Sequence, residues 1–148
     1  MARIRGEVLI RRPVEEVFDF VADGRNEPLY NPRMVRSVML TPGPVRAGTR
    51  WSATMAAPGR EVHLASRTTT YDRPRRLGSV SSMPGMDMDG AVTFRTDPDG
   101  TRVSWSWQLH PHGLLKLATP VLTRIGRRQE RQTWDGLKRH LETRPPRF

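Results

Sequence analysis

Residues 119–142, TPVLTRIGRRQERQTWDGLKRHLE, decide the fold. The apolar residues at the start of this stretch and just before it recur at spacings of three and four, which places them on one face of a helix: Leu114, Leu117, Ala118, Val121, Leu122 and Ile125. Thr119 followed by Pro120 predicts an N-cap and a first helical position. The preceding residues 113–118 form either a separate turn or a kinked lead-in, because proline inside a helix breaks its hydrogen-bond ladder.

The apolar stripe changes side along this helix. After Gly126 the apolar residues are Trp134, Leu137 and Leu141, which lie on a different face from Val121. Between the two groups lies a charged run, residues 127–132. The sequence therefore predicts one long C-terminal helix whose two ends meet different apolar surroundings.

The rest of the chain has the alternation of β-strands. Residues 4–11 alternate between apolar and polar, and residues 14–22 after Pro13 have a helical apolar face, followed by a short turn at residues 26–30. Further strands are predicted at residues 34–40, 49–56, 61–70, 77–82, 88–96 and 102–110. In the last of these, Val103, Trp105, Trp107 and Leu109 share one face. Strands kept apart from helices predict an α+β domain with helices on one face of an antiparallel sheet.

Composition limits the class of protein. The 148 residues suit a single domain, 1–148, with a core of about residues 3–142. No apolar run reaches the roughly 20 residues of a membrane span, and the first residues lack the apolar segment of a secretory signal, so we expect a cytoplasmic protein. The absence of cysteine excludes disulfides, and the net charge is +10.

Several segments, in this order, resemble the START-like (SRPBCC, helix-grip) superfamily, the polyketide cyclase/dehydrase and lipid-transport group that includes the Bet v 1-like fold. They are residues 13–23 (PVEEVFDFVAD), 30–32 (YNP), 45–51 (VRAGTRW), 70–74 (TYDRP) and the closing long helix. The resemblance implies a curved seven-stranded antiparallel sheet wrapped around the C-terminal helix, with two short helices after the first strand. It also implies a cavity between the sheet and that helix.

Such a cavity, of several hundred Å³, would bind a small hydrophobic molecule, either lipid-like or aromatic and polyketide-like. The residues expected to line it are Tyr30, Trp51, Met55, Leu64, Ser66, Thr68, Met86, Met88, Phe94, Trp105, Trp107, Leu114 and Val121. Met86 and Met88 are expected near its mouth. The alternative is that these residues simply fill a core.

A second hypothesis is a polyketide cyclase or dehydratase-like enzyme. Its general acid or base would be His112, just before the long helix, or Asp87, and the alternative for both is an ordinary solvated side chain. No cluster of residues has the spacing of a metal site, and no phosphate loop or nucleophile elbow is present. We therefore expect no metal and no cofactor.

The third hypothesis is a binder of nucleic acid or of another anionic surface. It rests on the net charge and on the Arg-rich helix flank formed by Arg124, Arg127, Arg128 and Arg131. No basic strand with interleaved aromatic residues and no recognition-helix motif supports nucleic acid, which therefore ranks last. The sequence leaves a homodimer open.

Overall fold

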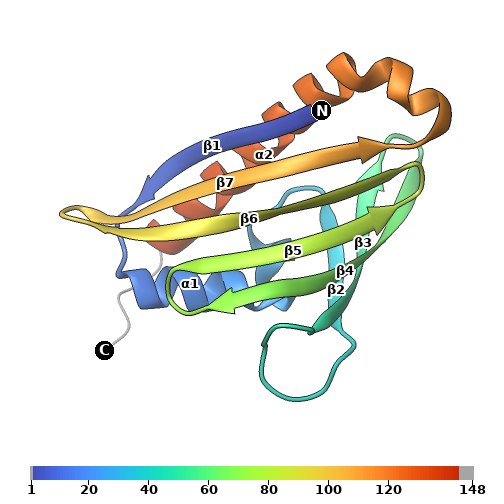
Figure 1. Ribbon diagram of the computed structural model, residues 1–148. Coiled ribbons are helices and arrows are strands. Elements are labelled where there is room, and N and C mark those ends of the chain that lie inside the picture. The colour runs from blue at the N-terminus through green and yellow to red at the C-terminus, as the bar shows by residue number, and fades with distance from the viewer. Residues whose placement is uncertain (1, 144–148) are drawn as a thin grey trace.

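Seven antiparallel strands form one sheet in the order β1-β7-β6-β5-β4-β3-β2 (Figure 1). The computed structural model describes residues 2–143. The elements are β1 (Ala2–Ile10), α1 (Val14–Ala22), η1 (Gly24–Leu29), β2 (Met34–Met39), β3 (Arg50–Ala57), β4 (Arg60–Asp72), β5 (Arg76–Met83), β6 (Met86–Asp97), β7 (Gly100–Pro111), η2 (Gly113–Ala118) and α2 (Thr119–Glu142). The predicted α+β helix-grip architecture is confirmed, including the two short helices after the first strand.

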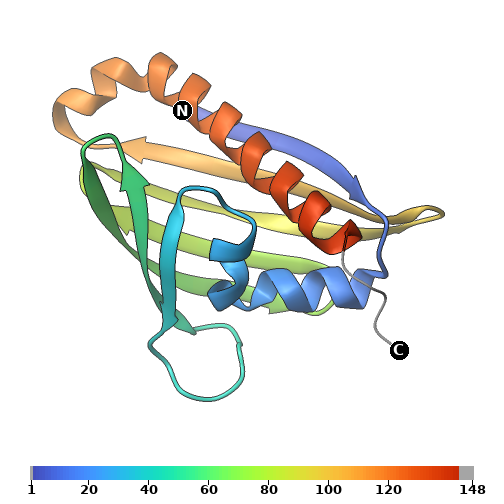
Figure 2. The same ribbon diagram turned by 180° about the vertical axis from the view of Figure 1, so that it is seen from behind.

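The sheet curves around α2, which crosses its concave side (Figure 2). Register shifts interrupt the pairing of β4 with β5 between Thr68 and Thr70, and of β2 with β3 between Met34 and Arg36. Irregularities of this kind bend a strand and increase its twist. The curvature leaves a space between the sheet and the helix that side chains must fill or leave open.

The C-terminal half of α2 is packed against the sheet. Leu137 and Leu141 are buried, and the indole of Trp134 stacks on that of Trp105 with ring centroids 5.4 Å apart. At Gly136 the helix passes so close to η1 that a Cβ would collide with the carbonyl oxygen of Tyr30. This half of the helix is therefore fixed by side-chain packing and by backbone contact.

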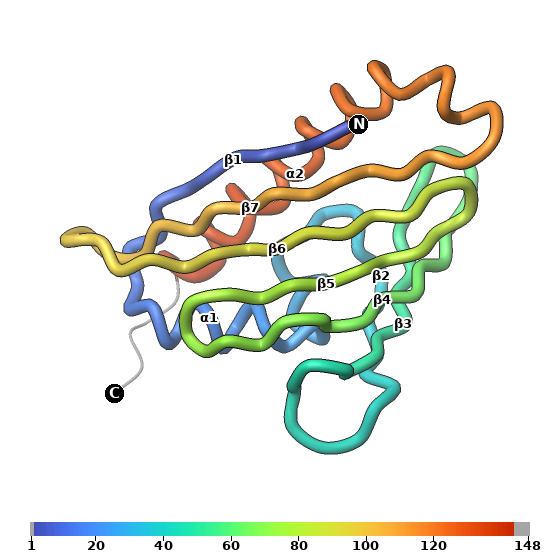
Figure 3. Tube along the Cα trace, in the orientation of Figure 1, coloured from blue at the N-terminus to red at the C-terminus, as the bar shows by residue number. Residues whose placement is uncertain are grey.

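The N-terminal half of α2 is reached through a sharp reversal after β7 (Figure 3). Residues 113–118 form the separate turn η2, and the N-cap of α2 is Ala118. The prediction of Thr119 as N-cap is wrong by one residue: its backbone is already helical, and its hydroxyl donates to the carbonyl oxygen of Lys116. Among the helices within residues 2–143, none is long and apolar enough to cross a membrane.

The turn between β5 and β6 is shorter than the gap between the strands predicted at residues 77–82 and 88–96. Met86 is already paired with Met83, and Pro84 and Gly85 make the turn. Gly85 has a φ of 81°, which favours glycine. Met86 and Met88 therefore lie on a strand of the sheet rather than on a flexible loop.

Leu137 tests the packing of α2, since its side chain is fully buried in the main core. Leu137→Ala should lower the free energy of unfolding by about 2–5 kcal/mol, because it leaves a cavity between α2 and the sheet. Leu40→Ala is the control, at a leucine that is 53% exposed, and should change the free energy by no more than about 0.5 kcal/mol. Urea denaturation measures both, and equal effects would show that α2 is not packed as described.

Candidate functional site: an acidic end in an apolar cavity

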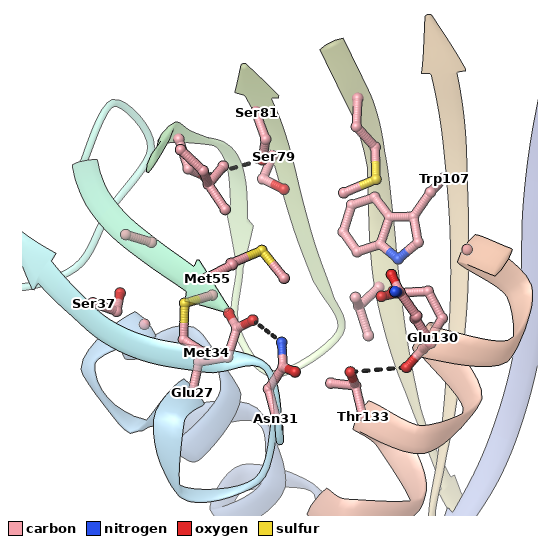
Figure 4. Close-up of a pocket in the computed structure, with 18 of the residues that line it drawn as sticks. Glu27, Asn31, Met34, Ser37, Met55, Ser79, Ser81, Trp107, Glu130 and Thr133 are labelled. Carbon is pink, nitrogen blue, oxygen red and sulfur yellow. Dashed lines mark hydrogen bonds between the residues drawn. The ribbon is translucent and has the colours of Figure 1, made fainter. Parts of the chain in front are cut away.

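A cavity of about 330 Å³ lies between the concave face of the sheet, η1 and the N-terminal half of α2 (Figure 4). Most of the residues that were predicted to line a pocket do line it: Tyr30, Trp51, Met55, Leu64, Ser66, Thr68, Met86, Met88 and Trp107. Further apolar wall comes from Met34, Met83, Leu122 and Ile125. Alternation along the strands accounts for Trp51, Met55, Leu64, Ser66, Thr68 and Trp107, which share the inward faces of their strands. The curvature of the sheet brings these faces around one space.

Phe94 and Trp105 share the concave face but do not line the cavity. Phe94 packs edge-on against Phe18 of α1, with ring centroids 5.2 Å apart. Trp105 is covered by Trp134 and by the guanidinium of Arg131, which lies 5.1 Å from its ring centroid. The predicted placement of both is wrong because α1 and the anchored half of α2 already cover this end of the sheet.

Leu114 and Val121 are also outside the cavity. Leu114 is 85% exposed and Val121 58% exposed, because η2 and the first turn of α2 stand away from the sheet (Figures 1 and 2). On the same helix, Leu122 and Ile125 turn toward the cavity. The apolar residues of this helix were identified correctly, but of the predicted stripe only Leu122 and Ile125 line the cavity.

The predicted acid or base candidates, His112 and Asp87, face away from the cavity. The Nε2 atom of His112 lies 3.1 Å from Oδ2 of Asp87, and both side chains are about half exposed. Alternation along β6 explains this, since Met86 and Met88 point inward and Asp87 points outward. Neither residue is placed for chemistry on a molecule inside the cavity.

Two carboxyl groups that the sequence analysis missed lie at one end of the cavity, Glu27 from η1 and Glu130 from α2 (Figure 4). Among the cavity-lining residues of the described chain, they are the charged ones, and Tyr30 is the other titratable group. The remaining polar groups at this end are side chains of Asn31, Gln129 and Thr133. The cavity is thus apolar along its walls and acidic at one end.

Glu27 is held by its neighbour in the chain turn that follows η1. The Asn31 amide nitrogen donates to Oε2 of Glu27 over 2.8 Å. Burial raises the pKa of Glu27, while the hydrogen bond from Asn31 and the positive charge of Arg33 act in the opposite direction. Burial therefore prevails, and the carboxyl is less acidic than it would be in water.

Glu130 shows the larger perturbation. Burial raises its pKa to about 7; the negative charge of Glu27 adds to the rise, and the hydrogen bond from the Trp134 indole nitrogen to Oε1, at 3.3 Å, opposes it. The indole N–H of Trp107 faces the same carboxyl and also lowers its pKa, although it makes no hydrogen bond of ordinary geometry within the described residues. At neutral pH this group can both hold and release a proton.

The positive charge of Arg33 lowers the pKa of both carboxyls, but its guanidinium is already hydrogen-bonded elsewhere. Its guanidinium donates to Oε1 of Gln132 at 2.8 Å, to the carbonyl oxygen of Gln129 at 2.7 Å and to Oγ1 of Thr133 at 3.1 Å. These bonds tie the chain before β2 to the middle of α2. Arg33 therefore fixes the helix beside the cavity and does not line it.

The hydroxyl groups predicted to bind a ligand have partners of their own. Thr68 accepts a hydrogen bond from the indole nitrogen of Trp51 at 3.1 Å. Ser66 accepts one from Ser81 at 3.4 Å. Within residues 2–143, no group of three or more His, Asp or Glu side chains is placed to hold a metal ion.

A signal for Glu130 was present in the sequence. Gly126, Glu130, Trp134 and Leu137 follow one another at spacings of three and four, so Glu130 lies on the buried side of the helix. Because arginines flank it on both sides, the whole segment was interpreted as a solvent-exposed charged run. Glu27 carried no comparable signal, because its position depends on how η1 packs against β2.

A known family matches nearly the whole chain. The family model described as polyketide cyclase / dehydrase and lipid transport matches residues 1–142. Among curated proteins, none matches this sequence.

Solved structures share the fold at low sequence identity. The Zhui aromatase/cyclase from Streptomyces sp. R1128 has a TM-score of 0.82 at 14% identity, over 95% of this chain and 93% of that one. TTHA0849 from Thermus thermophilus has a TM-score of 0.81 at 18% identity, over 95% and 97%. Ara h 8.0201 has a TM-score of 0.74 at 14% identity, over 95% and 98%.

The raised pKa of Glu130 predicts a pH-dependent stability. Between its unfolded value of 4.5 and its folded value of about 7, the native state keeps a proton that the unfolded state has lost, so stability falls as pH rises. Glu130→Gln cannot ionise. The wild type should therefore lose stability relative to this variant as the pH rises. The difference between their free energies of unfolding should change by on the order of 2 kcal/mol, in favour of Glu130→Gln, between about pH 5 and pH 8.

Urea denaturation across this pH range measures the difference. Glu61→Gln, at an exposed position of β4, is the matched control for removal of one carboxylate. A Glu130→Gln curve that runs parallel to the wild type at every pH would contradict the burial of this carboxyl.

Proposed function

Because this chain belongs to the polyketide cyclase / dehydrase and lipid transport family, we propose that it binds a small apolar molecule in the cavity under α2. The molecule is lipid-like or aromatic and polyketide-like. The observation that carries the proposal is the cavity itself, about 330 Å³ with mostly apolar walls, two carboxyls at one end and a few hydroxyl groups on the strands. A cavity of this size, with a mostly apolar lining and a few polar groups, is typical of small-molecule binding sites.

The walls suit an apolar occupant of variable shape. Five methionines line the cavity: Met34, Met55, Met83, Met86 and Met88. Their flexible thioether side chains adapt to different surfaces and make favourable contacts with aromatic rings. Removing about 150 Å² of apolar ligand surface from water contributes roughly 4 kcal/mol, before the cost of immobilising the ligand.

The second candidate is a cyclase or dehydratase-like reaction, and Glu130 is the observation that favours it. A carboxyl with a pKa of about 7 is suited to general acid–base catalysis near neutral pH. In its protonated form it would donate to a departing hydroxyl, which leaves as water, and Glu27 would take the proton from the neighbouring carbon. Both carboxyls line the same cavity.

The binding proposal is tested by filling the cavity from β5. Ser79 lines it, whereas Val80 is on the opposite face of the same strand. Ser79→Phe should weaken binding of the fluorescent apolar probe N-phenyl-1-naphthylamine by about tenfold or more, because its ring occupies space that the ligand needs. Val80→Phe should leave the affinity unchanged, and equal probe affinity in both variants would contradict a site in this cavity.

The two candidates are separated by the molecules that travel with the protein. Native mass spectrometry of wild type and Glu130→Gln purified from the same host compares their bound ligands. A carrier should hold the same molecule in both. A dehydratase should hold, in the variant, a molecule heavier by one water.

A further inference from the structure

The charge of the cavity is opposite to the charge of the protein. The chain has a net charge of +10, yet the charged side chains lining its cavity in the described residues are Glu27 and Glu130. The lining there includes no arginine, lysine or histidine. A ligand whose polar end is a carboxylate would find no cation to pair with.

The nearby cation does not fill this role. Within the described residues, the Arg33 guanidinium donates three hydrogen bonds, all to α2, to Gln129, Gln132 and Thr133. Arg33 is also outside the cavity lining. Its charge serves to keep the two carboxyls partly ionised, because it lowers the pKa of both. An anionic ligand group would have to displace these bonds to reach it.

The buried indole nitrogen of Trp107 indicates which protonation state of Glu130 a bound ligand should favour. Trp107 is 8% exposed, and its indole nitrogen, which faces Glu130 (Figure 4), has no hydrogen bond of ordinary geometry to any described residue. An ionised carboxylate is a stronger acceptor than a neutral acid. A cationic ligand group would favour the ionised form of Glu130 and so make it a better acceptor for this N–H.

We infer that the cavity selects apolar molecules that carry a protonated amine, with the ammonium group at the Glu27 and Glu130 end. This inference rests on the proposed binding function and names the class of its ligand. An ammonium offers N–H donors to a carboxylate, and the second carboxylate at the same end of the cavity adds electrostatic attraction. A carboxylate at the same place would lose its hydration and face two groups of its own charge.

Amine binding should also depend on pH. The groups that face Glu130 are Glu27 and Tyr30 from η1, Arg33 from the chain before β2, and the uncharged indoles of Trp107 and Trp134. Tyr30 stays neutral, because burial raises its pKa well above the ordinary value. The affinity for an amine should therefore rise with pH as Glu130 loses its proton, until the amine itself is deprotonated.

The test uses three probes that differ only in their polar end: 1-naphthylmethylamine, 1-naphthalenemethanol and 1-naphthoate. Each competes with N-phenyl-1-naphthylamine for the full-length protein near neutral pH. The amine should bind at least about tenfold more tightly than the carboxylate, and Glu130→Gln should reduce this preference by about tenfold. Glu61→Gln, on the exposed side of β4, should retain the preference.

The outcomes distinguish a failure of the amine preference from a failure of the binding function. Equal affinities, a preference for naphthoate, or a preference unaffected by Glu130→Gln would overturn the selection of amines while leaving an apolar binding cavity in place. Failure of all three probes and of N-phenyl-1-naphthylamine to bind would overturn the binding function and the ligand class together.

Discussion

The structure depends on the anchoring of the C-terminal half of α2 on the sheet. Trp134 stacks on Trp105, Leu137 and Leu141 are buried, and Gly136 lets the helix touch the carbonyl of Tyr30. Because interiors pack closely, this half of the helix has one stable position on the curved sheet. Arg33 adds hydrogen bonds at residues 129–133, just where the buried packing begins. Toward its N-terminus the helix still approaches the sheet at Gly126, where a Cβ would collide with the side chain of Ile4 on β1. Only its first turn, with the exposed Val121, stands away, and the cavity lies beneath this half of the helix.

The same anchoring explains why two carboxyls line the cavity of a basic protein. Glu130 lies one turn before Trp134, so the packing of the helix places it in the cavity lining. The pair is completed by Glu27, which the close approach of η1 to α2 brings to the same end. Burying carboxyls costs free energy unless something compensates, and groups perturbed in this way are enriched at functional sites. The arginines that give the chain its net charge, including Arg124, Arg127 and Arg128, lie outside the cavity lining, so their field is screened by solvent.

Most of the fold could be predicted from the sequence because the spacing of apolar residues along the chain identifies its helices and strands. The alternation of apolar and polar residues around Trp105 and Trp107 identified β7. The apolar residues of the C-terminal helix change face after Gly126, which identified a helix whose two ends have different apolar surroundings. The placement of single residues depended on tertiary geometry. Leu114 and Val121 belong to the correct stripe but face solvent, because the angle at which η2 leaves the sheet is not encoded in spacing. Glu130 has the spacing of a buried residue, yet its charge and its arginine neighbours indicated a solvated one.

One measurement tests the acidic end of the cavity most directly. The four tryptophans report on it, since the indole of Trp107 faces Glu130 at the cavity end whereas Trp105 lies under Trp134 and outside the lining. Nitrogen–proton correlation NMR spectra resolve the indole N–H signal of each tryptophan during titration with 1-naphthylmethylamine. The account predicts that the Trp107 signal moves most and that the Trp105 signal moves least. A Trp107 signal that stays in place while the amine binds would contradict it.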